Sequence, residues 1–368
     1  MKITDIDIRM CRHKETGMKD SEMRDGKKSD LEFLVITFHT DEGLSSSTFG
    51  FAGRGAAMAG EIANSIFKPF FIGRDPLYRE KHWHEYRTAD RWWNHAPIYS
   101  YGPFDINCWL LSSMKAEQPL YKYLGAYRDS VPIYGSSLVL KTPDAYAKEA
   151  IEYKNRGFNA YKLHPPGDYD FDLEAHKAVR KAVGDDFKLM SDPVAPYTFE
   201  QALRFGRELE KLNYYWYEEP LFDENFHNLR ELTRILDIPI VGTEVLAKHP
   251  YSVAECISTR VVDVVRADPS WSGGITATMK TAHLAESFGV SCEIHTAIYH
   301  PLELVNLHCC AAIKNCEFFE VLLPYDLFNF GLKESIQIKG GYAQLPNKPG
   351  LGIDLDWDFI DNTTFKKI

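Results

Sequence analysis

The sequence between residues 187 and 244 repeats one pattern three times: FKLMSD (187–192), YYWYE (214–218) and PIVGTE (239–244). Each run is short and largely apolar, and each ends in an acidic side chain. The stretches between them, such as 199–212, have the periodicity of amphipathic helices. Short apolar strands that alternate with helices predict a parallel sheet built from β/α units.

The same alternation extends in both directions from this stretch. We predict eight strands, at 131–134, 159–164, 187–192, 214–219, 239–244, 261–268, 290–295 and 318–323. Helical patterns lie between them, and the repeat predicts an α/β fold of the (β/α)-barrel type. A doubly wound open sheet is the alternative. It is disfavoured because eight consecutive units exceed its usual number, and no GxGxxG follows a strand.

The first part of the chain has a different character. We predict strands at 2–10, 31–39 and 44–49, with a hairpin turn at TDEG (40–43) and a polar, mobile loop over 13–30. Helices follow, one ending near Phe71 and one around 102–123. We therefore expect an α+β domain over residues 1–125, a barrel over 126–324, and a tail, 325–368, that packs back on the first domain.

Composition restricts the classes of partner. The chain has 368 residues, is 45% hydrophobic and carries a formal net charge of −10, so we expect no nucleic-acid partner. The N-terminus MKITDIDIRM lacks the apolar core of a secretory signal, and no stretch reaches the roughly 18 apolar residues of a membrane span. Seven cysteines without a CxxC pair indicate free thiols. We expect a cytoplasmic protein that forms a homo-oligomer.

Titratable side chains end seven consecutive predicted strands. They are Lys162 and His164, Asp192, Glu218, Glu244, Asp268, His295 and Glu320, at steps of 28 (from His164), 26, 26, 24, 27 and 25 residues. Helix capping explains a single Asp at such a place, but Glu, Lys and His are poor caps. In a parallel barrel the carboxyl ends of the strands form the active-site face, so these side chains are candidate functional residues.

Three of these residues are carboxylates on adjacent strands. Asp192, Glu218 and Glu244 offer the hard oxygen ligands that Mg²⁺ prefers, and without a cation they would raise one another's pKa. Glu219 competes with Glu218 for the inward position, because strand side chains alternate. We choose Glu218, which keeps an even spacing between its neighbours.

The other strand ends offer acid–base groups. Lys162 and His164 lie two residues apart and share a face, and a cationic Lys162 beside a metal would keep His164 neutral and able to accept a proton. Asp268 and His295 end neighbouring strands, so the carboxylate can fix the imidazole tautomer. Glu320, if protonated, could donate to a developing oxyanion.

Several motifs together resemble the mandelate racemase branch of the enolase superfamily. They are TDEGL (40–44), YKLH (161–164), SDP (191–193), WYEEP (216–220), VGTE (241–244), RAD (266–268) followed by Gly273-Gly274, EIHTA (293–297) and PGLGID (349–354). The resemblance covers essentially the whole chain. It implies an α+β capping domain over a modified (β/α)7β barrel of the TIM type.

The resemblance also implies roles for the candidate residues. Asp192, Glu218 and Glu244 would bind Mg²⁺, a base would follow the second strand, and a His295–Asp268 dyad would lie across the substrate. Glu320 would correspond to an acid that hydrogen-bonds the substrate carboxylate. Two positions depart from the pattern of the branch: His164 stands where a second lysine is usual, and Val194 stands where asparagine is frequent.

The reaction expected from this machinery begins with removal of the proton α to a carboxylate. Loss of a β-hydroxyl would then give a 2-keto-3-deoxy acid, and we rank this dehydration of a sugar acid first. Return of the proton from the opposite face would make a racemase or epimerase, the alternative. The polar, basic segment 13–30 favours a polyhydroxylated anionic substrate, and residues 49–51 with Arg54 are expected to line a lid.

Three readings from other classes remain open. His82-Trp83-His84 resembles the HxH of a zinc hydrolase, although its context is helical rather than a barrel strand end. Lys162 could form a Schiff base in an aldolase. A barrel that binds sugar acids without catalysis is the third. Bound zinc, borohydride trapping and α-proton exchange would distinguish these readings from enolisation.

Overall fold

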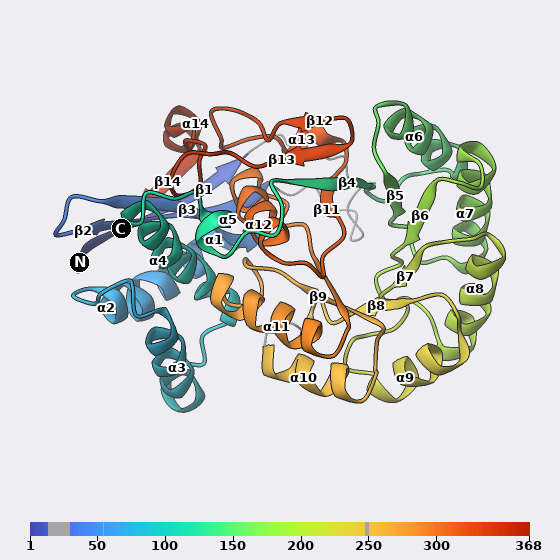
Figure 1. The fold of residues 1–368 in the computed structure, drawn as a ribbon, viewed down its shortest axis with the longest axis horizontal. Helices are drawn as coiled ribbons and strands as arrows, with labels where there is room; N and C mark the ends of the chain where they lie inside the picture. The colour runs from blue at the N-terminus through green and yellow to red at the C-terminus, as the bar shows by residue number, and fades with distance from the viewer. Residues whose placement is uncertain (14–29, 54, 247–249) are drawn as a thin grey trace.

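The computed structural model describes residues 1–13, 30–53, 55–246 and 250–368, and it has two parts that pack side by side (Figure 1). The smaller part holds an antiparallel sheet and the larger part a parallel barrel-like sheet surrounded by helices. The predicted loop over 13–30 lies almost wholly outside the described residues, and so does Arg54. The expected boundaries of the domains stay a prediction.

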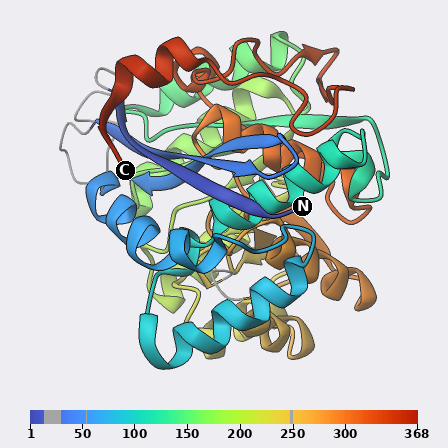
Figure 2. The same ribbon diagram turned by 90° about the vertical axis from the view of Figure 1, so that its left-hand side faces the viewer.

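The smaller part is built on a four-stranded sheet in the order β14-β1-β2-β3, which faces the viewer in Figure 2. Its strands are β1 (Ile3–His13), β2 (Leu31–Thr40), β3 (Ser45–Gly53) and the C-terminal β14 (Thr364–Lys367). The predicted hairpin joins β2 to β3, where Thr40 donates its N–H to the carbonyl of Leu44 and Gly43 adopts a φ of 78°.

Helices of this part cover one face of the sheet. They are α1 (Ala56–Ile62), η2 (Ala63–Phe67), α2 (Lys68–Phe71), α3 (Arg79–Ala89), η3 (Asp90–Asn94), η4 (Ile98–Ser100), α4 (Gly102–Lys115) and α5 (Leu120–Tyr123). Helix formation over 102–123 was predicted, and the structure divides it into α4 and α5 before Pro119, whose φ and missing N–H suit a helix start. Apolar side chains such as Phe38, Phe71 and Phe104 fill the core between sheet and helices.

The larger part contains the eight predicted strands, and the predicted fold class is confirmed. The strands are β4 (Ser130–Ser136), β5 (Ala160–Leu163), β6 (Lys188–Ser191), β7 (Trp216–Glu218), β8 (Ile240–Gly242), β9 (Val264–Ala267), β10 (Ser291–Ile294) and β11 (Phe319–Leu322). Parallel ladders connect them in the order β10-β9-β8-β7-β6-β5-β4, and β11 pairs with β4. The carboxyl ends of these strands therefore meet at one face.

Helices pack around these strands (Figure 1), and one follows each of the strands β4 to β10. They are α6 (Pro143–Asn155), α7 (Tyr169–Val183), α8 (Phe199–Lys211), α9 (Phe226–Ile235), α10 (Pro250–Ser258), α11 (Ile275–Ser287) and α12 (His300–Ala312). Capping side chains stabilise the N-termini of several of these helices. Thr198 and Gln201 form a capping box at α8, and Asp168 accepts the N–H of Phe171 at α7.

A buried glutamate connects β10 to the chain that enters β11. Glu293 of β10 accepts the N–H of Glu317 (2.8 Å) at Oε1 and that of Phe318 (3.2 Å) at Oε2. Burial raises the pKa of Glu293 to about 7. β10 and β11 stand at the two ends of the barrel strand order, and among the described residues no backbone ladder pairs them. The two hydrogen bonds of Glu293 therefore connect these ends.

The C-terminal tail contacts both parts. It contains α13 (Tyr325–Phe328), β12 (Ile338–Lys339), β13 (Tyr342–Gln344) and α14 (Trp357–Thr363) before β14. β13 pairs antiparallel with β4 of the barrel, and β14 pairs with β1 of the smaller sheet. The tail therefore links the barrel to the smaller part.

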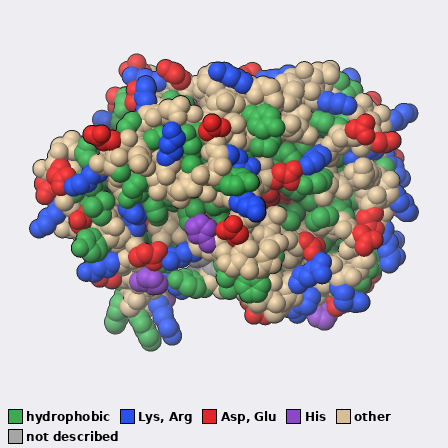
Figure 3. All heavy atoms as spheres, viewed as in Figure 1, with side chains coloured by type: hydrophobic (Ala, Val, Ile, Leu, Met, Phe, Trp, Pro, Cys, Tyr) green, Lys and Arg blue, Asp and Glu red, His purple; other side chains and the backbone are tan. Residues whose placement is uncertain are grey.

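The surface and the cysteines agree with the composition. Acidic and basic side chains are interspersed over the face in Figure 3. All seven cysteines are buried and form no disulfide. In the part of the chain that the structure describes, no helix has the length and apolar character needed to cross a membrane.

Candidate active site

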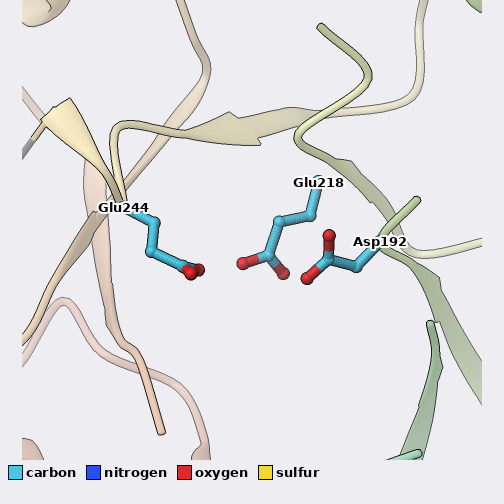
Figure 4. Close-up of side chains that lie close together, drawn as sticks. All are labelled: Asp192, Glu218 and Glu244. Carbon is cyan, nitrogen blue, oxygen red and sulfur yellow. The ribbon is translucent and has the colours of Figure 1, made fainter. Parts of the chain in front are cut away.

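Three carboxylates point toward one another at the carboxyl ends of adjacent strands (Figure 4). Asp192 follows β6, Glu218 is the last residue of β7, and Glu244 lies two residues beyond β8. One oxygen of each lies within 4.8 Å of the others. Asp192 and Glu218 are buried, and Glu244 is partly accessible from the mouth of the barrel.

The turns that carry these residues have an unusual backbone. Positive φ angles occur at Val194, Ala195, Glu219, Thr243 and Ile298, all just beyond or beside the strand ends. Such angles are rare outside glycine and concentrate at functional sites. Hydrogen bonds hold them here: Ala195 donates its N–H to the carbonyl of Glu219 (2.8 Å), and Thr243 donates to Asp223 (2.9 Å).

Lys162 lies among the carboxylates. It belongs to β5, is fully buried, and places Nζ 2.9 Å from Glu218, 2.9 Å from Glu320 and 3.1 Å from Asp192. Burial lowers the pKa of Lys162, but the charges of Glu218 and Glu320 outweigh it and raise the pKa well above its usual value. Three carboxylates around Nζ favour the ammonium form of Lys162, which disfavours the Schiff-base reading because that chemistry needs a neutral amine.

Arg266 of β9 is a second buried cation beneath the carboxylates, and we assigned it no role from the sequence. Its Nε lies 2.7 Å from Glu218, and its guanidinium also donates to Glu320. Arg266 precedes Asp268 by two residues, so the two share a strand face. Lys162 and His164 were grouped because they lie two residues apart, and the same spacing from Asp268 could have identified Arg266 in the sequence.

The donor set fits a divalent cation. The carboxyl groups around the mouth outnumber the cations Lys162 and Arg266; they belong to Asp192, Glu218, Glu219, Glu244, Asp268 and Glu320. Burial, with the charges of Glu219 and Glu218, raises the pKa of Glu244 well above its usual value. Its Oε2 has no hydrogen-bond partner among the described residues. The carboxyl groups therefore leave a net negative charge at the mouth, and the three oxygen donors that converge there match the preference of Mg²⁺.

His295 and Asp268 form a hydrogen-bonded dyad. Nδ1 of His295 lies 2.9 Å from Oδ2 of Asp268, and Oδ1 of Asp268 accepts the backbone N–H (2.5 Å) and hydroxyl (2.6 Å) of Ser270. The carboxylate therefore orients the imidazole, and Nε2 faces Glu244 at 3.1 Å. The ring of Trp271 packs against the imidazole with 4.7 Å between centroids.

His164 lies at the other end of the row of carboxylates. Its Nδ1 is 2.7 Å from the carbonyl oxygen of Ser137, which can only accept, so Nδ1 carries a proton. Nε2 faces Asp192 at 2.9 Å. The side chain is partly exposed, at 20%. The two imidazoles thus place Nε2 toward the carboxylates from opposite ends.

Glu320 differs from its predicted position. It lies inside β11, where it pairs with Tyr134, and does not end the strand, because the ladder with β4 continues to Leu322. Burial raises its pKa, but Lys162 and Arg266 outweigh burial and hold the pKa well below its usual value. The two cations favour the ionised form of Glu320, which accepts hydrogen bonds, and donation from a protonated Glu320 stays a prediction.

The zinc reading finds no support among the described residues. His82 of α3 is buried and pairs through Nε2 with the carbonyl of Asp75 (2.7 Å). In the described ranges the carboxylates Asp192, Glu218 and Glu244 are the group of three or more candidate ligands that could hold a metal.

The family description "Enolase C-terminal domain-like" matches residues 145–359. The chain belongs to the enolase superfamily. Its motifs place it in the mandelate racemase and muconate lactonizing enzyme branch, as the sequence resemblance indicated.

Relatives in this superfamily include sugar-acid dehydratases. The chain is 31% identical to arabinonate dehydratase of Saccharolobus solfataricus, over 82% of this chain and 84% of that protein. It superposes with a TM-score of 0.89 on D-glucarate dehydratase of Agrobacterium tumefaciens complexed with magnesium, at 33% identity and full coverage of both chains. L-talarate dehydratase of Polaromonas sp. JS666, complexed with Mg and L-glucarate, is 27% identical (TM-score 0.86; 100% of this chain, 98% of that one).

Proposed function

We propose that this enolase-superfamily enzyme is a Mg²⁺-dependent dehydratase that converts a sugar acid to a 2-keto-3-deoxy acid. The observation that carries the proposal is the row of three carboxylates with an imidazole Nε2 at each end, from His164 and His295. A row of oxygen ligands between two potential bases suits abstraction of a proton α to a bound carboxylate. Relatives named as sugar-acid dehydratases support the same class of substrate.

The proposed ligands are Asp192, Glu218 and Glu244. The chemistry that Mg²⁺ supplies at such a group is stabilisation of negative charge on carboxylate oxygens. Lys162 contributes a buried ammonium beside the same place, and its charge would favour the doubly charged enediolate over the carboxylate from which it forms. Glu320 and Arg266 hold these groups in place through ion pairs, Glu320 with Lys162 (2.9 Å) and Arg266 with Glu218 (2.7 Å).

The two histidines are proposed to move protons. Asp268 holds the Nδ1 proton of His295, so the Nε2 lone pair of its neutral form is available as a base. The carbonyl of Ser137 fixes the same tautomer at His164. One imidazole would remove the α-proton, and the imidazolium so formed, or the other histidine if it starts protonated, would give a proton to the β-hydroxyl, which leaves as water. The resulting enol then tautomerises to the 2-keto-3-deoxy acid.

A racemase or epimerase is the second candidate, because two imidazoles on opposite sides could exchange the α-proton between faces. The products separate the two reactions. Dehydration gives a 2-keto acid that has lost the β-hydroxyl, whereas racemisation inverts the configuration at the α-carbon and leaves the molecular formula unchanged.

The test is a panel of mono- and diacid sugars incubated with Mg²⁺ in D₂O. Keto product is measured as a semicarbazone, and α-deuterium is measured by NMR. We expect keto product from at least one acid, with kcat reduced by about 10²–10⁴-fold in His295→Asn or in His164→Ala. Keto product absent and deuterium present would favour the racemase. Absence of both for every acid would refute enolisation, and full turnover by both variants would refute the assignment of the bases.

A further inference from the structure

Two side chains of α12 form hydrogen bonds with the segment 295–298, which begins with His295. Asn306 donates from Nδ2 to the carbonyl oxygen of His295 (2.6 Å). Glu303, three residues earlier on the same helix face, accepts at Oε1 the hydroxyl of Thr296 and the backbone N–H of Ile298 (2.8 Å). Both side chains are buried, and neither lies in the row of carboxylates described above.

The same segment, 295–298, also forms a hydrogen bond with Glu320. The backbone N–H of Thr296 donates to Oε2 of Glu320 (3.1 Å). One residue, Thr296, therefore connects Glu303 through its hydroxyl to Glu320 through its amide, and it follows His295 directly in the chain. A shift of Thr296 would move both His295 and Glu320.

The backbone conformation of the turn between β10 and α12 depends on side-chain contacts. Ile298 has a φ of 69°, a conformation that a β-branched residue adopts only when its surroundings impose it. The N–H of Ile298 is one of the two donors that Glu303 accepts. Without that acceptor, the turn between β10 and α12 would relax toward an ordinary φ and carry Thr296 with it.

We propose that Glu303 is a positioning residue that fixes His295 and Glu320 for the reaction, and the kinetic part of this inference rests on the proposed function. Glu303 acts as a hydrogen-bond acceptor for the turn rather than as an acid or base. Its second oxygen, Oε2, has no hydrogen-bond partner among the described residues. Glu303 also lines a small cavity together with His300, Glu320 and Tyr325. Glutamine can supply the same acceptor, whereas leucine cannot.

The variants to compare are Glu303→Gln and Glu303→Leu. Glu149→Leu is the matched control, because Glu149 is also a largely enclosed carboxyl that accepts a hydrogen bond, from the hydroxyl of Tyr161 (2.8 Å), and lies on α6. Hydrogen exchange of the segment 295–299 reports the turn without any substrate. Steady-state kinetics, on an acid that the wild type converts, reports its effect on the reaction.

We expect Glu303→Gln to keep kcat within about threefold. Glu303→Leu should lose about 10–100-fold in kcat with KM changed less than about threefold, because misplacing a catalytic group affects the chemical step. Exchange of 295–299 should rise about tenfold or more in Glu303→Leu only. Glu149→Leu should lower the melting temperature without changing kcat or the exchange of this segment.

Two results would overturn the inference: a folded Glu303→Leu with wild-type kcat and exchange, or equal loss of kcat in the Gln and Leu variants. If Glu303→Leu does not fold, Thr296→Val removes the hydroxyl alone and should reduce kcat about 3–10-fold; unchanged kcat and exchange would overturn the inference. A wild type inactive on every acid refutes the proposed function instead, and hydrogen exchange then decides the role of Glu303 by itself.

Discussion

Arg266 carries much of the charge balance inside the barrel. It is fully buried and contacts Glu218 and Glu320, which are themselves buried. Removal of one partner of a buried ion pair leaves an uncompensated charge and typically costs about 3–5 kcal/mol. Arg266→Met should therefore lower the free energy of unfolding by about that amount, and Arg266→Lys by less, because lysine keeps the charge but not the fork that reaches two carboxylates.

Urea denaturation without added metal measures this prediction. Arg234→Met is the control, since Arg234 makes an exposed pair with Glu231 (2.8 Å) and its loss should have no measurable effect. An Arg266→Met variant as stable as the wild type would show that Lys162 alone balances the carboxylates.

At the scale of residues, sequence spacing predicted which side chains meet but not how they are charged. The steps between strand ends brought Asp192, Glu218 and Glu244 together, because parallel strands end at one face. The cations around Glu320 were not predicted, since they come from strands β5 and β9, far away in the sequence. Pairings of this kind depend on which strands face each other across the barrel interior.

At the scale of elements, Asp105 of α4 caps the N-terminus of the barrel helix α11. Oδ2 accepts the N–H of Thr276 (2.9 Å) and Oδ1 its hydroxyl (2.7 Å). Gly274, the N-cap of α11, has a φ of 96°, and a Cβ there would lie 2.3 Å from Oδ2 of Asp105. The second glycine of the Gly273-Gly274 motif is thus required by this contact between the two parts of the molecule.

Burial raises the pKa of Asp105 from 3.8 to about 6, which predicts a pH dependence. The folded protein holds this proton more tightly than the unfolded chain, so the stability from Asp105 is greatest below pH 3.8 and is lost as pH rises to about 6. The difference in unfolding free energy between wild type and Asp105→Asn should fall by about 3 kcal/mol over that window. Parallel pH profiles for the two proteins would contradict this account.

The sequence predicted the existence of the barrel strands better than their ends. The strand predicted at 214–219 is observed as β7 (Trp216–Glu218). The apolar pattern continues beyond the ladder, since Tyr214 is buried in the loop, and the chain turns at Glu219, where φ is 39°. Apolar patterns do not distinguish a paired residue from a buried loop residue, so seven of the eight barrel strands were predicted too long. The strand predicted at 131–134 is the exception, since β4 covers 130–136.

At the scale of the whole molecule, buried contacts connect the tail to both parts. His308 of α12 accepts the N–H of Tyr121 at Nδ1 (3.1 Å), and its Nε2 lies 2.9 Å from the carbonyl oxygen of Leu351. Leu351 belongs to the PGLGID motif, whose role was not evident from the sequence. The tail was expected to return to the first domain, but its pairing with β4 depends on contacts between residues more than two hundred positions apart. The expected homo-oligomer stays a prediction.

Cation binding should stabilise the whole fold, because the proposed ligands lie at the carboxyl ends of three consecutive barrel strands and lose their arrangement on unfolding. A ligand that binds only the folded state stabilises it by about 2.7 kcal/mol at one hundred times its Kd. Mg²⁺ should therefore raise the melting temperature in a saturable way that EDTA reverses, and Na⁺ at equal ionic strength should not. Asp192→Asn with Glu244→Gln should abolish the increase, since it removes two of the three charges, whereas Glu149→Gln should retain it. An equal increase in all three proteins would mean that Mg²⁺ acts elsewhere, and the proposed ligands would be wrong.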